Sequence, residues 1–142
     1  MAATDLLEHA RDLLARAPVI DGHNDLLWEA REKVGYDFDR LDIASPCPDV
    51  MTDIPRILEG RLGGQFWSVY VPSNLPGDSA VTATLEQIDA LHAMVARYPD
   101  VFELARTADD VERVTAAGRV ASMIGVEGGQ SIGSSLGSAP AT

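Results

Sequence analysis

The chain has 142 residues, enough for one domain with one core but too few for a complete eight-stranded β/α barrel, which takes about 250 residues. With 46% hydrophobic and 23% charged residues, it has the composition of a folded domain and not of a disordered segment. Its 22 acidic and 11 basic residues give a formal net charge of −11, which disfavours binding to nucleic acid and to anionic lipid surfaces.

The first half of the chain predicts one helix and one short strand. Apolar residues at helical spacing predict a helix over residues 6–17, which Pro18 ends. Residues 19–21 are typical of a short strand. The polar segment 29–61 contains three prolines, so we expect an irregular connection there, with short helical turns around residues 51–58.

The second half alternates strands and helices. Residues 63–72 are β-branched, aromatic and uncharged, which is typical of a buried strand. A helix is expected over residues 79–97, and a second one from the capping pair Thr107 and Asp110 to Gly118. Residues 120–126 predict another buried strand. This alternation indicates an α/β fold with a parallel sheet, in which ligands bind at the carboxyl ends of the strands.

Three polar side chains follow two of these strands. His23 and Asp25 come directly after the first strand, and side chains two residues apart in an extended segment point the same way. An imidazole and a carboxylate placed in this manner can chelate a zinc-like ion, although His-x-Asp is also common in surface turns. Glu127 ends the last strand and is the only charged residue between Val120 and Thr142. It either binds a metal ion or emerges into solvent.

Three segments resemble the membrane (renal-type) dipeptidase family of zinc metallopeptidases. They are Val19–Leu26, Gly63–Pro72 and Ile124–Gly129, and they occur in the order and spacing of that family. The resemblance implies a metal-dependent β/α (TIM) barrel that hydrolyses dipeptides with a metal-bound water. It also implies two zinc ions, with His23 and Asp25 on the first and Glu127 bridging both as the catalytic ligand.

The family also uses two later histidines, which this sequence does not contain. The only other histidines are His9 and His92, both expected on helix faces. We therefore expect the N-terminal part of a longer dipeptidase, with about three of the eight barrel strands. Residues 1–136 would form the partial barrel, and residues 137–142 a divergent low-complexity tail.

Alternative functions remain open at this point. One is a non-catalytic truncated fragment or interaction module, since an open sheet exposes edges and an apolar face, which favours poor solubility or a homo-oligomer. A remote one is a serine hydrolase, because Gly129–Gly133 matches the G-x-S-x-G pattern around Ser131. That class needs a histidine after the serine, and none follows.

Two further expectations concern redox state and location. Cys47 is the only cysteine and lies between two prolines, so we expect an unreactive loop thiol and no disulfide within the chain. The sequence has neither the basic start and apolar run of a signal peptide nor an apolar stretch of about 18 residues that would span a membrane. We expect a cytoplasmic protein with a dipeptide substrate.

Overall fold

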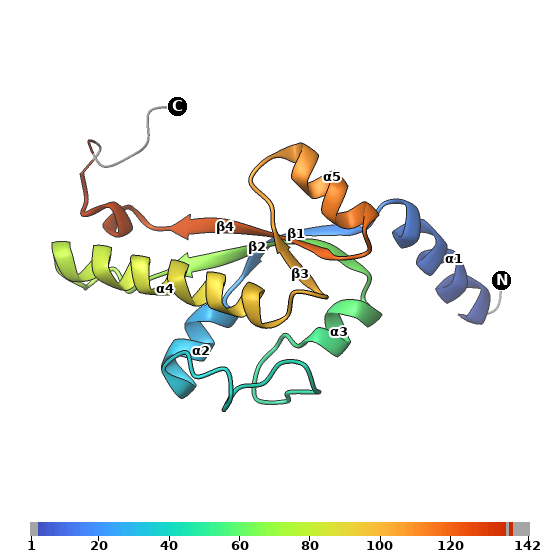
Figure 1. The fold of residues 1–142 in the computed structure, drawn as a ribbon, viewed down its shortest axis with the longest axis horizontal. Helices are drawn as coiled ribbons and strands as arrows, with labels where there is room; N and C mark the ends of the chain where they lie inside the picture. Colours follow the sequence, from blue (N-terminus) through green and yellow to red (C-terminus); the bar gives the residue numbers. More distant parts are fainter. Residues whose placement is uncertain (1–2, 136, 138–142) are drawn as a thin grey trace.

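The structure, a computed structural model, describes residues 3–135 and residue 137. It is an α/β fold with one parallel sheet, as the sequence predicts, and Figure 1 shows helices on both faces of that sheet. The elements in chain order are α1 (Ala3–Arg16), β1 (Val19–Asn24), α2 (Leu26–Val34), α3 (Ile54–Glu59), β2 (Leu62–Tyr70), α4 (Gly77–Arg97), β3 (Phe102–Leu104), α5 (Ala108–Ala116), β4 (Val120–Glu127) and the 3-10 helix η1 (Gly129–Ile132).

The strand order β1-β2-β4-β3 determines where the functional residues lie. All three pairings are parallel, with Asn24 opposite Trp67 and Tyr70 opposite Glu127. Strand β2 therefore separates β1 from β4, and the carboxyl ends of these three strands lie along one end of the sheet.

The main core lies between the sheet and helices α2, α3 and α4, which cover one face (Figure 1). Trp67 of β2 is fully buried there and meets the ring of Phe102 edge to face, with 5.7 Å between the ring centroids. Helix α5 covers part of the other face, where Val114 and Ala121 are buried in a smaller cluster. Burial on both faces explains why β2 reads as a nearly continuous apolar run.

Two of the sequence-based expectations about secondary structure were wrong. The segment 29–61 is not irregular throughout, because α2 continues to Val34 and buries Leu26, Leu27 and Ala30. Its end is fixed by Gly35, whose φ of 60° lies in the left-handed region that glycine tolerates. The sheet also has a fourth strand, β3, which we did not predict and which pairs with the first half of β4.

The sheet is open at both edges, as expected for a partial β/α barrel. Strand β3 ends opposite Ser122, so the rest of β4 has a neighbour on one side only. Ile124 and Val126 are 37% and 50% exposed along this edge. Helix α1 extends beyond the sheet at the end opposite the β4 arrowhead (Figure 1), and its apolar residues Leu6 and Leu13 are exposed.

Two further expectations concerned a membrane-spanning segment and the C-terminal tail. Within residues 3–135 and 137, no helix is both long and apolar enough to cross a membrane. Most of the low-complexity tail expected at residues 137–142 lies outside the described residues.

Candidate metal centre

The end of β1 brings His23 and Asp25 to the same side of the chain. His23 is on the strand, and Asp25 follows it as the N-terminal cap residue of α2. The His23 Nε2 and Asp25 Oδ2 atoms are 3.0 Å apart. Between them, Asn24 makes its side-chain contacts with other parts of the chain, as the alternation of side chains along a strand requires.

Glu127 reaches the same point from the end of β4. Its Oε2 atom is 3.8 Å from His23 Nε2, although β2 lies between the two strands. One ligand atom from each of His23, Asp25 and Glu127 lies within 4.8 Å of the others. One nitrogen and two carboxylate oxygens at this separation match the donor set that zinc takes in proteins, and three protein ligands leave a coordination position open. The residues therefore fit a metal ion.

The charges of this cluster are only partly balanced within the described chain. The hydrogen bond with Asp25 raises the pKa of His23 above 6.5, and the negative charges of Asp25 and Glu127 act in the same direction. All three side chains are about half exposed, between 46% and 57%. A cation bound by these three side chains would balance the two carboxylate charges.

Neighbouring polar groups hold the ligands in place. The Ser68 hydroxyl on β2 donates a 2.9 Å hydrogen bond to Glu127 Oε2. Asn24 is fixed on the other side of β1: its Nδ2 donates to Thr52 Oγ1 at 2.9 Å, and its Oδ1 accepts from the Leu26 N–H at 3.0 Å. Such outer contacts orient metal ligands and raise metal affinity in many sites.

A cavity of about 560 Å³ opens beside His23 and Asp25. Its other wall is the loop that precedes α3, with Asp49, Met51 and Thr52. A volume of this size accommodates a small organic ligand.

The remaining sequence candidates lie outside the cluster. His9 is exposed on α1 and His92 is on α4, as expected for helix-face residues. Ser131 is 4% exposed, and its hydroxyl donates to the Glu127 carbonyl oxygen at 3.0 Å. A nucleophilic serine needs an accessible hydroxyl next to a base, so this contact does not favour a serine hydrolase.

Sequence reasoning missed Ser68 and Asn24 as supporting residues. Ser68 is buried in a mostly apolar strand, and a buried hydroxyl needs a hydrogen-bond partner. Asn24 stands between two predicted ligands, so strand alternation could have placed its side chain on the opposite side. The role of Thr52 could not be predicted from the sequence, because Thr52 and its partner Asn24 are 28 residues apart in the chain.

Sequence comparisons identify relatives over most of the chain. The sequence model for "Membrane dipeptidase (Peptidase family M19)" matches residues 7–139. The chain is 43% identical over 130 residues to "Dipeptidase ataJ" of Aspergillus terreus (strain NIH 2624 / FGSC A1156), covering 86% of this chain and 32% of that protein. It is 42% identical over 146 residues to "Dipeptidase verJ" of Clonostachys rogersoniana, covering 94% and 37%. The chain thus spans about a third of the length of these curated relatives.

Solved structures agree with the sequence match. A metallopeptidase from Rhodobacter sphaeroides, liganded with a phosphinate mimic of the dipeptide L-Ala-D-Ala, is similar with a TM-score of 0.67 and 25% identity, over 81% of this chain and 39% of that one. The dipeptidase AC, a metallopeptidase of family M19, is similar with a TM-score of 0.67 and 26% identity, over 81% and 38%. The chain belongs to the membrane dipeptidase family, peptidase family M19.

Proposed function

We propose that His23, Asp25 and Glu127 bind zinc and that this site serves the hydrolysis of dipeptides. The observation that carries the proposal is the approach of three ligand atoms, from the ends of two strands that are not neighbours, to within 4.8 Å. Membership of a dipeptidase family supports the reaction class. Zinc bound here would polarise the peptide carbonyl and lower the pKa of a bound water.

The residues of this chain have separate tasks in that proposal. His23 must lose its proton to offer Nε2 as a ligand, and Asp25 and Glu127 supply negative charge that favours a cation. Ser68 keeps the Glu127 carboxylate in one orientation. The cavity beside the cluster would hold the dipeptide, and the Asp49 carboxylate in its wall would attract the free amino group of that substrate.

The ligand set supports one ion and not two. The resemblance implies a second zinc held by two further histidines, whereas His9 and His92 lie on α1 and α4, outside the cluster. We therefore propose that residues 1–136 form one part of a β/α barrel that contributes the first zinc ligands. Metal binding without turnover is what we expect of these residues alone. The open sheet edges favour association into a homo-oligomer.

Metal analysis and a dipeptidase assay test the proposal together. We expect the purified chain to bind about one zinc ion with moderate affinity and to show no turnover of dipeptides. Asp25→Asn and Glu127→Gln should each weaken zinc binding by about tenfold or more, measured by competition with a chromogenic chelator. Glu32→Gln, an exposed carboxylate on α2, is the matched control and should leave affinity unchanged.

Two results would contradict this assignment. Zinc binding that is the same in Glu127→Gln and in the parent chain would show that the ion binds elsewhere. Turnover of dipeptides by the 142-residue chain at two zinc ions per chain would show that a second site exists, and that the one-ion proposal is wrong.

A further inference from the structure

Strand β1 carries an extra residue just before the proposed metal ligands. Asp21 is opposite Gln65 and Asn24 is opposite Trp67, so two residues of β1 lie between these pairs where β2 has one. Such an insertion is a β-bulge. Bulges are rare between parallel strands, and they are over-represented next to active sites, where they change the direction of a side chain.

This bulge determines which face of the sheet His23 occupies. Trp67 is buried in the main core, so Asn24 opposite it points toward the same helices. Asp21 points there too, because Asp21 and Asn24 line one cavity next to α3. In a regular strand His23, two residues after Asp21, would share that face. The extra residue turns His23 and Asp25 to the other face.

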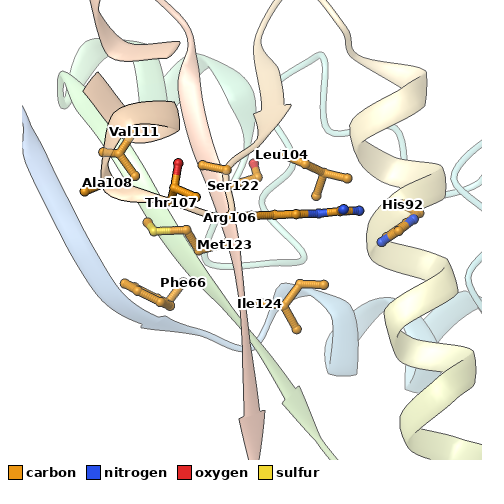
Figure 2. Close-up of a pocket in the computed structure, with 11 residues that line it drawn as sticks. Phe66, His92, Leu104, Arg106, Thr107, Ala108, Val111, Ser122, Met123 and Ile124 are labelled. Atoms are coloured by element: carbon orange, nitrogen blue, oxygen red, sulfur yellow. The ribbon is translucent and has the colours of Figure 1, made fainter. Parts of the chain in front are cut away.

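Glu127 also lies on that other face. Phe66 and Ser68 alternate with the core-facing residues of β2, so they point away from the main core. Figure 2 shows the ring of Phe66 on this side, beside Met123, the residue opposite it on β4. The Ser68 hydroxyl contacts the Glu127 carboxylate here. Without the bulge, His23 and Glu127 would therefore lie on opposite faces of the sheet.

Two side chains bind the backbone around the bulge. Gln65 is fully buried, and its Nε2 atom donates to the Asp21 carbonyl oxygen at 3.3 Å. Its Oε1 atom accepts from Asn24 Nδ2 at 3.4 Å, so the Gln65 amide contacts β1 before and after the extra residue. On the other side, Asp21 Oδ1 accepts from the His23 N–H at 3.3 Å.

We propose that Gln65 and Asp21 are positioning residues of the metal centre, which hold the bulge that turns His23 and Asp25 toward Glu127. The inference rests on the zinc site proposed above, and both residues act through the backbone of β1 without touching the ion. A buried amide costs free energy unless it is hydrogen-bonded. An apolar residue of similar volume in place of Gln65 would fill the space but leave the two sides of the bulge unconnected.

Gln65→Met tests this, because it keeps the volume of the side chain and removes its hydrogen bonds. We expect zinc affinity, measured by chelator competition on folded chain, to fall by about tenfold or more, the usual effect of losing a contact that orients a ligand. Val114→Ala, a core truncation under α5, is the matched control: it should lower stability and leave zinc affinity unchanged. Parent affinity in folded Gln65→Met, or an equal loss in Val114→Ala, would overturn the proposal.

A second measurement needs no metal, so it separates this inference from the proposed function. In metal-free chain the ring of His23 should show a nuclear Overhauser effect to the side chain of Glu127, since Nε2 and Oε2 are 3.8 Å apart. We expect Gln65→Met to lose this effect and Val114→Ala to keep it. A parent chain that shows the effect but binds no zinc would refute the zinc site alone. Persistence of the effect in Gln65→Met would refute the role of the bulge contacts.

Asp21 provides a variant outside the core, should Gln65→Met fail to fold. Asp21 is half-buried, and Asp21→Ala removes the acceptor for the His23 N–H, whereas Asp21→Asn keeps an oxygen at that place. We expect the effect between His23 and Glu127 to be lost in Asp21→Ala and retained in Asp21→Asn. An unchanged effect in Asp21→Ala would show that these side chains do not hold the bulge.

Discussion

Asp53 ties together the loop that forms one wall of the cavity beside the metal centre. Its side chain is 2% exposed, and its Oδ2 atom accepts from the Cys47 N–H at 2.8 Å and from Arg56 Nε at 2.9 Å. Oδ1 accepts from the Arg56 N–H at 3.0 Å and caps α3. Arg56 in turn donates to the Val50 carbonyl oxygen. Replacing Asp53 by Asn should therefore loosen the whole loop.

The expected loss follows from the proton affinity of the carboxyl. Hydrogen bonds from Arg56 lower the pKa of Asp53 from 3.8 to about 2, with further contribution from the Cys47 N–H. Since a tenfold change in proton affinity is about 1.4 kcal/mol, the ionised carboxylate stabilises the fold by about 2 kcal/mol at neutral pH. In Asp53→Asn the amide NH₂ also faces donors that the carboxylate satisfied, which adds to this loss.

The pH dependence has a definite sign. The folded-state pKa lies below the unfolded value, so the stabilisation is complete above pH 3.8 and disappears as the pH falls toward 2. We expect the difference in free energy of unfolding between the parent chain and Asp53→Asn to be about 2 kcal/mol or more at pH 7. The carboxylate's share of that difference should fall to about half by pH 3.

Urea unfolding followed by tryptophan fluorescence between pH 7 and pH 3 measures this difference. Asp49→Asn is the matched control, because Asp49 lies in the same loop and is exposed. It should change stability by less than about 0.5 kcal/mol. A difference between Asp53→Asn and the parent chain that stays constant over this pH range would refute the reasoning, since the loss would then not come from the ionised carboxylate.

Three further predictions concern packing, capping and charge. Gly63→Ala should destabilise the fold by about 1–3 kcal/mol in urea unfolding, because its Cβ would lie 2.4 Å from the ring of the proline that precedes β1; Gly77→Ala, which meets no atom within 4 Å, should not. Thr107→Ala should cost about 1 kcal/mol, read from the thermal unfolding midpoint, because it removes the capping box of α5. Asp25→Asn should lower the pKa of His23, followed by NMR titration of the ring in metal-free chain; an unchanged pKa would show that Asp25 does not hold the proton there.

The strands that the sequence predicts are those whose own residues form a recognisable apolar run. Residues 63–72 and 120–126 are apolar runs, and a strand buried on both faces needs no partner to be recognised. Strand β3 has only three residues, Phe102–Leu104, and is a strand because β4 lies beside it. Propensity over so short a segment cannot indicate pairing with a strand that comes 16 residues later in the chain.

Helix α2 was missed for a related reason. It has nine residues and buries only Leu26, Leu27 and Ala30, while its remaining positions include both signs of charge. So few apolar residues give only a weak helical periodicity. Three prolines follow within residues 29–61, so the whole segment, including the end of α2, was expected to be irregular. Its stability comes from contact with β2 and α4, which a single sequence does not contain.

The residues of the metal centre also differ in how far the sequence alone could predict their positions. His23 and Asp25 could be paired from strand alternation alone, and the structure has them 3.0 Å apart. The approach of Glu127 depends on the register of two pairings, β1 with β2 and β2 with β4, which hydrophobic patterning does not determine to the residue. The sequence singled out Glu127 by its place at the end of an apolar strand, and the resemblance to a family implied its role as a metal ligand. The fold supplies the reason that it lies near His23.

The carboxylates of Asp25 and Glu127 repel each other, and within the cluster only His23 contacts both of them. Neutral groups outside the cluster add to the order of these side chains. Ser68 donates to Glu127 from β2, and Asn24 fastens the end of β1 to Thr52 and to the start of α2. Thr52 precedes Asp53, so the buried Asp53 network stabilises the loop on which Asn24 depends. Loss of that network should therefore loosen the position of Asn24, through its contact with Thr52, and with it the end of β1 that carries His23. Asp53 would have this effect although it does not line the cavity.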